Sequence, residues 1–182
     1  MSRACAATAR RAAAALLGAL LWAAAPAAVA SAAVEPELFP IGSPAPLFEA
    51  VDTEGNAFSL AEALKERPVL IAFWSLFCAT CRDELPILEQ EQAKYRDKVQ
   101  FVTVNLDEAP RAKTVKGFAK QQGFTMRMLL NKVEGREFNI DGAFKIKATP
   151  ALYLVNRDGM VAYGHYGALN PEELAEVIAK AK

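Results

Sequence analysis

The chain has 182 residues, of which 53% are hydrophobic, and its 21 basic and 21 acidic side chains give a formal net charge of zero. Three of the basic residues lie near the N-terminus, whereas every acidic residue comes later, so the rest of the chain is slightly acidic. This balance does not predict a nucleic-acid partner, because binding to phosphate backbones requires an excess of Lys and Arg. We predict a signal peptide at residues 1–30, a linker at residues 31–41 and a single domain at residues 42–182, which is long enough for one hydrophobic core.

The N-terminal segment is typical of a secretory signal peptide. Its basic residues are followed by an apolar run from Ala12 to Ala25 and by the small-residue cleavage site Ala28-Val29-Ala30. The apolar character continues to Val34, so an uncleaved anchor in the inner membrane is the alternative. Both interpretations predict a periplasmic or other extracytoplasmic location.

A hairpin, a helix and a buried strand are the first elements expected in the domain. Residues 47–58 predict a short β-hairpin, because a turn-forming segment separates two apolar stretches. Ser59 is a suitable N-cap for a helix over residues 60–67, with Glu62 completing a capping box. The stretch 69–74 is apolar throughout, as in parallel strands that are buried on both faces.

A Cys-x-x-Cys pair follows, at the point where the strand pattern gives way to a helical one over residues 78–95. Cys78 and Cys81 are the only cysteines beyond the signal peptide. A disulfide that closes so short a loop contributes little stability, because the loop-closure entropy is small. The first thiol would meet a helix N-terminus, which lowers a cysteine pKa from about 8.5 to between ~3.5 and ~7.5. We therefore predict a redox-active pair. Pro86 is expected to kink the helix without ending it.

A metal site is the competing interpretation of this motif. A tetrahedral structural zinc site needs four ligands, typically Cys or His. Beyond the signal peptide the chain offers two Cys and one His, His165, which follows the turn at residues 156–159 and is expected to be a partly exposed strand residue. We predict no metal and no organic cofactor.

Strands and helices continue to alternate beyond residue 95. Strands are predicted at 99–106, 126–130, 151–155 and 160–163, helices at 110–122 and from 171 to the C-terminus, and helix and loop at 133–144. Alternating polarity in the first of these strands indicates less burial than at residues 69–74. Asn170 is expected to cap the last helix, with Pro171 at its first position. This order predicts an α/β fold with a mixed sheet covered on both faces.

Six motifs in this order resemble the thioredoxin-fold proteins, and among them the TlpA-like thiol-disulfide oxidoreductases, whose relatives include the cytochrome c maturation reductases of the ResA and CcmG kind. The resemblance implies a thioredoxin-like fold with an N-terminal β-hairpin and a helix–strand insertion between Pro110 and Leu130. The motifs are residues 42–46, Phe73-Trp74, Glu84 with Pro86, residues 104–107, residues 148–150 and the turn at residues 156–159.

The resemblance also implies roles for particular residues. Cys78 would be the exposed nucleophile and Cys81 the buried resolving thiol. Pro150 would be a cis-proline packed against the disulfide, which leaves the backbone of Thr149 to pair with an incoming peptide. Glu84 would accept or donate the proton of Cys81; the alternative is a solvated helix glutamate.

Trp74 and Phe77 would be the aromatic residues of the substrate-binding surface. Phe77 departs from the family pattern, which has Trp before the first cysteine, and Ala72 stands where thioredoxin has a buried Asp. The pair between the cysteines is Ala79-Thr80 instead of Gly-Pro, so the sequence does not predict a reduction potential.

The predicted function is reduction of disulfides in exported proteins, apocytochrome c among them, with a membrane electron donor regenerating the dithiol. Three alternatives stay open at this point. The protein could be a disulfide-forming oxidant or isomerase, a non-enzymatic binding domain, or a peroxiredoxin-like thiol peroxidase. For the peroxidase, Ser75 fits the Pro-x-x-x-Thr/Ser-x-x-Cys motif, but Ile71 stands where that motif needs Pro.

Overall fold

The computed structural model describes residues 36–182 of the chain. The predicted signal peptide and its possible role as an anchor lie outside these residues, as does the first half of the predicted linker. Among residues 36–182, no helix is both long enough and apolar enough to cross a membrane.

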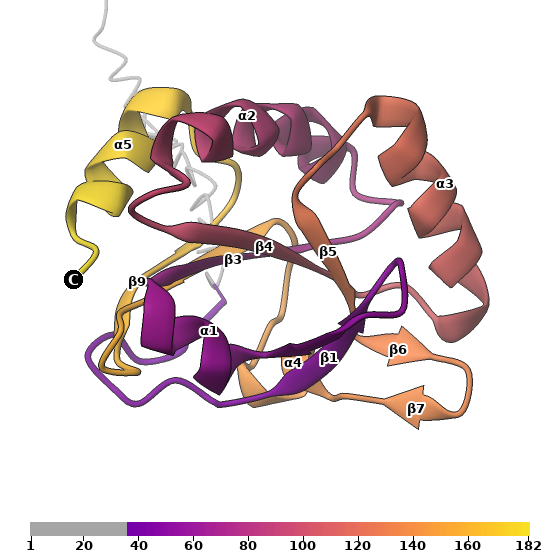
Figure 1. Ribbon diagram of the computed structural model, residues 1–182, viewed down its shortest axis with the longest axis horizontal. Coiled ribbons are helices and arrows are strands. Elements are labelled where there is room, and N and C mark those ends of the chain that lie inside the picture. The colour runs from indigo at the N-terminus through magenta and orange to yellow at the C-terminus, as the bar shows by residue number, and fades with distance from the viewer. Residues whose placement is uncertain (1–35) are drawn as a thin grey trace, which may run out of the picture. The chain divides into compact units, whose positions relative to one another are not determined.

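A mixed seven-stranded sheet, in the order β2-β1-β5-β4-β3-β8-β9, forms the centre of the domain (Figure 1). Its strands are β1 (Glu49–Asp52), β2 (Ala57–Ser59), β3 (Val69–Trp74), β4 (Gln100–Asn105), β5 (Arg127–Leu130), β8 (Ala151–Val155) and β9 (Val161–Tyr166). Strands β3, β4 and β5 are parallel to one another, and the remaining pairs are antiparallel. This is the predicted thioredoxin-like architecture, including the N-terminal hairpin.

Helices cover both faces of the sheet (Figure 1). One face carries α2 (Ala79–Tyr95), α3 (Ala112–Gln122) and α5 (Pro171–Ala179), and the other carries α1 (Leu60–Glu66) and α4 (Ile140–Ala143). A short 3-10 helix, η1 (Ala109–Arg111), precedes α3, and a small hairpin of β6 (Lys132–Val133) and β7 (Arg136–Glu137) follows β5.

Strand β3 separates the two hydrophobic cores. Val69, Ile71 and Phe73 point into the core beneath α1 and α4, whereas the alternate residues contribute to the core beneath α2, α3 and α5. All six residues of β3 are buried, as its apolar sequence predicts. The next strand is less buried than β3, as predicted, but only slightly: five of the six residues of β4 are buried, because β4 lies between two parallel neighbours.

Three expectations need correction. The predicted capping box is absent, because the Ser59 side chain makes no capping hydrogen bond and Glu62 forms an ion pair with Lys65 instead. Helix and loop are predicted at residues 133–144, and helix α4 lies there, but the region also contains most of the β6–β7 hairpin, whose two-residue strands are too short to show a periodicity. Strand β9 extends to Tyr166, three residues beyond its predicted end.

The C-terminal part of the predicted linker belongs to the packed domain. Leu38 and Phe39 pack against the core beneath α1, and the Phe39 N–H donates to the Tyr153 hydroxyl at 3.0 Å. The packed domain therefore includes residues before residue 42.

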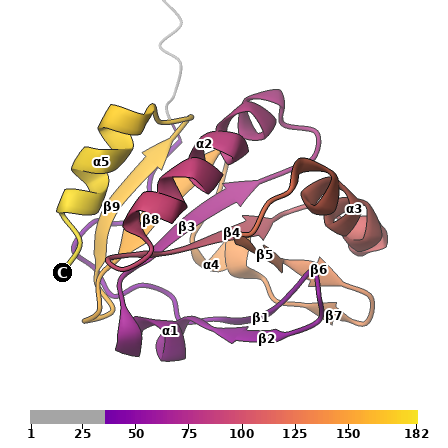
Figure 2. The same cartoon turned by 45° about the horizontal axis from the view of Figure 1, so that its top comes forward.

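One edge of the sheet gathers four loops (Figure 2). Trp74 at the end of β3 pairs with Asn105 at the end of β4, and Phe73 pairs with Ala151 at the start of β8. Ala151 in turn pairs with Tyr166 at the end of β9. The residues that follow β3, β4 and β9 and those that precede β8 therefore meet at this edge, where α2 begins.

Candidate active site

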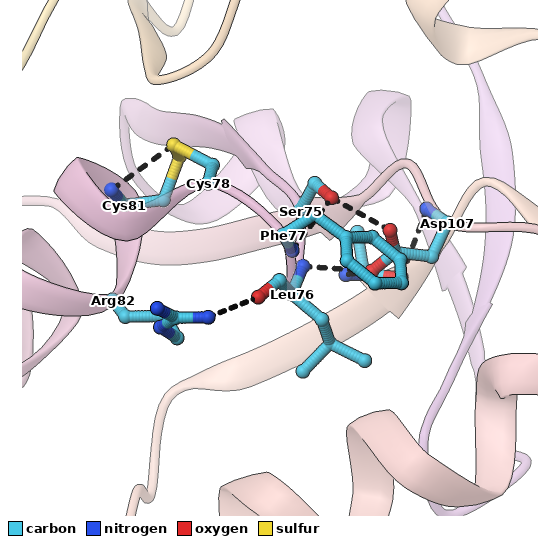
Figure 3. Close-up of a disulfide and its surroundings, with 8 residues drawn as sticks. Ser75, Leu76, Phe77, Cys78, Cys81, Arg82 and Asp107 are labelled. Atoms are coloured by element: carbon cyan, nitrogen blue, oxygen red, sulfur yellow. Dashed lines mark hydrogen bonds between the residues drawn. A yellow bond between two sulfur atoms is a disulfide. The ribbon is translucent and has the colours of Figure 1, made fainter.

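Cys78 and Cys81 form a disulfide at the N-terminus of α2, with an S–S distance of 2.07 Å and a Cα–Cα distance of 5.2 Å (Figure 3). Cys78 is the N-cap residue, and its Sγ accepts a hydrogen bond from the Cys81 N–H at 3.1 Å. Cys81 is 1% exposed, whereas Cys78 is only partly buried. The same N–H group and the helix dipole would stabilise a thiolate on Cys78 after reduction.

Asp107 positions the loop that leads to Cys78 (Figure 3). Its carboxylate accepts hydrogen bonds from the Ser75 hydroxyl at 2.6 Å and from the Leu76 N–H and the Asn105 amide, both at 2.8 Å. A charged acceptor that binds three donors holds this loop more firmly than a neutral one. The sequence pointed to residues 104–107 only as a motif; the signal it offered was an acidic residue just after a buried strand.

Phe77, immediately before the first cysteine, is the most exposed of the large hydrophobic residues in the described part of the chain, at 68%. The guanidinium carbon of Arg111 lies 4.5 Å from the centre of its ring. This distance is typical of a cation–π contact. Arg111 comes from η1, after β4, and nothing in the sequence linked it to the cysteines.

The peptide bond between Thr149 and Pro150 is cis, which confirms the expectation for this position. Pro150 is buried and its carbonyl accepts a hydrogen bond from the Gly167 N–H at 2.9 Å, while Thr149 is partly buried. The register of β8 against β3 places this bond at the same edge of the sheet as the disulfide.

Glu84 lies on α2, one helical turn beyond Cys81, and is 3% exposed. One of its oxygens accepts a hydrogen bond from the Leu169 N–H at 3.1 Å. Burial raises the pKa of the Glu84 carboxyl from 4.5 to about 7, against the opposing effect of the Leu169 hydrogen bond. The alternative of a solvated helix glutamate is therefore wrong.

Comparison with known proteins places these features in a family. The Redoxin family model matches residues 40–180. The protein YneN of Bacillus subtilis, described as thioredoxin-like, is 30% identical over 136 residues, which cover 74% of this chain and 76% of the relative. The thiol-disulfide oxidoreductase ResA of Bacillus thuringiensis is 30% identical over 145 residues, which cover 79% of this chain and 80% of ResA. The chain belongs to the Redoxin family.

Solved structures agree with this assignment. A Chlorobium tepidum protein described as the thiol:disulfide interchange protein DsbE is 26% identical and superposes with a TM-score of 0.66, over 78% of this chain and 96% of that protein. StoA of Bacillus subtilis, also 26% identical, superposes with a TM-score of 0.61 over 75% of this chain and 98% of StoA. Within the family, the protein is a thiol-disulfide oxidoreductase of the ResA and DsbE type, with the Cys78–Cys81 pair.

Trp74 lies beneath this redoxin site instead of on its surface. It is 1% exposed, its indole N–H donates to the Thr103 hydroxyl at 3.2 Å, and its ring packs against Phe118. A substrate cannot touch a side chain that is buried in this way, so Trp74 supports the site from within the core. Of the two aromatic residues predicted to bind substrate, only Phe77 is accessible.

The residues that suggested other functions have different surroundings. His165 is partly buried in β9 and stacks on Tyr163, with a centroid separation of 6.3 Å. Within residues 36–182, no three His, Cys, Asp or Glu side chains are grouped so that they could hold a metal ion. The Ser75 hydroxyl, which fits the peroxidase motif, donates to Asp107.

Proposed function

We propose that this redoxin reduces disulfides in exported proteins, with apocytochrome c among its substrates, in the periplasm or another extracytoplasmic compartment. The observation that carries the proposal is the difference in exposure between the two cysteines. Cys78 is partly accessible at a helix N-terminus, whereas Cys81 is 1% exposed. Such an arrangement suits one attacking and one resolving thiol.

In the reduced protein, the Cys78 thiolate attacks one sulfur of a substrate disulfide. The Cys78–substrate bond forms as the substrate S–S bond breaks, and the second substrate sulfur leaves as a thiolate that takes up a proton. Cys81 then loses its proton and attacks the Cys78 sulfur, which releases the first substrate sulfur. The substrate gains two electrons and two protons, and the protein is left with the Cys78–Cys81 disulfide.

Glu84 is proposed as the acceptor of the Cys81 proton. The support is its position one turn beyond Cys81 and a carboxyl pKa of about 7, which lets both protonation states exist near neutral pH. On re-reduction the same carboxyl would return the proton to Cys81.

The substrate chain is proposed to lie against the cis-proline loop. The backbone of Thr149 would pair with the extended substrate, Pro150 would separate it from the strand below, and the Phe77 ring would form an apolar wall beside Cys78. The exposure of Phe77 and the position of Pro150 at the same edge of the sheet as the disulfide support this placement. A membrane electron donor would then supply the two electrons that restore the dithiol.

The test is capture of the mixed disulfide. A Cys81→Ser variant, reduced and mixed with an oxidised Cys-x-x-Cys-His peptide, should accumulate a covalent Cys78–peptide adduct, because the resolving thiol is missing. Intact-mass spectrometry detects the adduct, and a Cys78→Ser variant is the matched control that should form none at this position. Failure of the Cys81→Ser variant to form an adduct would contradict the scheme.

A further inference from the structure

The exposed charged side chains around the disulfide are mostly basic, although the chain as a whole has no net charge. We define the active-site rim as residues 75–84, 106–111, 145–150 and 166–170, the four loops at the edge of the sheet where α2 begins, with the first turn and a half of α2. Its basic residues are all exposed and come from three of these loops: Arg82, Arg111, Lys145 and Lys147. None of them forms an ion pair with any carboxylate in the described part of the chain.

The carboxylates of the rim offset this charge only in part. Asp107 is 8% exposed and its oxygens accept three hydrogen bonds, Glu84 is buried, and Glu108 pairs with Lys132 at 3.0 Å. Asp83 is the one exposed rim carboxylate without an ion pair among residues 36–182. The N-terminus of α2 adds a further partial positive charge beside Cys78.

Arg111 is a rim cation with a defined contact to the residue next to Cys78, whereas Arg82 donates to the Leu76 carbonyl at 2.7 Å. The Arg111 guanidinium lies over the ring of Phe77, the residue that precedes Cys78 in the chain. The loop carrying Phe77 is itself held by hydrogen bonds from Ser75 and Leu76 to Asp107. A cation–π contact uses none of the N–H donors of the guanidinium, so these groups are left to bind a carboxylate.

We propose that Arg111, positioned by Phe77, selects protein substrates whose disulfide is flanked by Asp or Glu residues. This inference rests on the proposed reductase function and specifies its substrate class. A substrate carboxylate within reach of Arg111 would lie beside Cys78 at the moment of attack. Lys145 and Lys147, next to the cis-proline loop, would attract acidic residues farther along the same substrate chain. Because charges on the rim are exposed, the effect is chiefly on the rate of encounter and falls with salt.

The experiment compares three synthetic peptides with one oxidised Cys-x-x-Cys-His core, flanked on both sides by Glu, Gln or Lys. Rates of reduction by the pre-reduced full-length protein are measured by acid quenching and alkylation of the new thiols. At low ionic strength the Glu peptide should react fastest and the Lys peptide slowest, with about a tenfold difference between them. Molar salt should reduce that difference to less than about twofold.

Variants identify the residue responsible. Arg111→Gln should slow reduction of the Glu peptide and accelerate reduction of the Lys peptide, so that the ratio of the two rates falls about threefold. Phe77→Leu, which removes the ring but keeps an apolar side chain, should lower the ratio in the same direction. The matched control is Arg96→Gln, an exposed arginine at the opposite end of α2, which should leave the ratio unchanged.

Each remaining outcome separates the two proposals. Equal rates for the three peptides with the wild-type protein would overturn the charge selection and leave the reductase function standing. An equal slowing of all three peptides by Arg111→Gln would also overturn it, because Arg111 would then act on the Cys78 thiolate and not on the substrate. Reduction of no peptide at all would overturn both proposals.

Discussion

At the scale of single residues, Glu84 couples stability to pH. Its pKa in the folded oxidised protein is about 7, because burial disfavours the carboxylate, whereas its ordinary value is 4.5. The folded state therefore binds more protons than the unfolded state between these values, and stability is lost as the pH rises through 7. A shift of this size corresponds to about 3 kcal/mol.

Replacing Glu84 with Gln should remove this dependence. The free energy of unfolding of the wild type, measured by denaturant titration, should fall by about 3 kcal/mol relative to that of Glu84→Gln between about pH 4 and about pH 8. This pH range covers the ordinary and the raised pKa of the Glu84 carboxyl. Glu176→Gln, on the exposed face of α5, is the control and should give a nearly constant offset. Parallel curves for wild type and Glu84→Gln would show that Glu84 titrates normally.

In turnover, Glu84→Gln should slow the resolving step if the carboxyl moves the Cys81 proton.

Asp107 stabilises the protein by holding the loop before Cys78 in place. Asp107→Ala would leave the Ser75, Leu76 and Asn105 donors without their acceptor, so the oxidised protein should lose about 2 kcal/mol of stability. Chemical denaturation measures the loss. Asp83→Ala, an exposed acidic residue on α2, should change stability by less than about 0.5 kcal/mol. Similar losses in the two variants would contradict the anchoring role.

At the scale of elements, a buried hydrogen bond joins β3 to β4 below the site. The Trp74 indole donates to Thr103, and both residues are 1% exposed. Thr103→Val keeps the shape but removes the acceptor, so it should cost about 1–2 kcal/mol of stability. In a Trp74→Phe background, which has no donor, the same substitution should cost almost nothing. A double-mutant cycle by denaturant unfolding gives the coupling, and equal costs in both backgrounds would show that the bond contributes nothing.

At the scale of the whole molecule, the proposed direction of electron flow sets the reduction potential. A reductase supplied by a membrane donor should have a Cys78/Cys81 potential near or below about −250 mV, close to the value of about −270 mV for thioredoxin. Thiol trapping of the folded protein across a series of redox buffers measures this quantity. A value near about −120 mV, as in a strong disulfide-forming oxidant, would instead favour the alternative direction and remove the cytochrome-maturation role.

The features that could be predicted from the sequence are those encoded over a few neighbouring residues. The continuous apolar run of β3, the Cys-x-x-Cys pair at the following helix start and the Asn170 cap of α5 each depend on local spacing and backbone preference. Pro150 belongs with them, because an X-Pro bond is where a cis peptide can occur at little cost. Together with the order of elements, these signals were sufficient for the fold class and for the redox chemistry.

Tertiary structure alone decided the surroundings of those residues. The hydrogen bond to Glu84 comes from Leu169, which lies 85 residues away in the chain, and the Arg111–Phe77 contact joins two loops that follow different strands. The burial of Trp74, predicted to bind substrate, and the anchoring role of Asp107 likewise follow from the pairing of β3 with β4. Exposure, pKa and cation–π contacts depend on distances between segments that are remote in the chain, and local spacing carries no information about those distances.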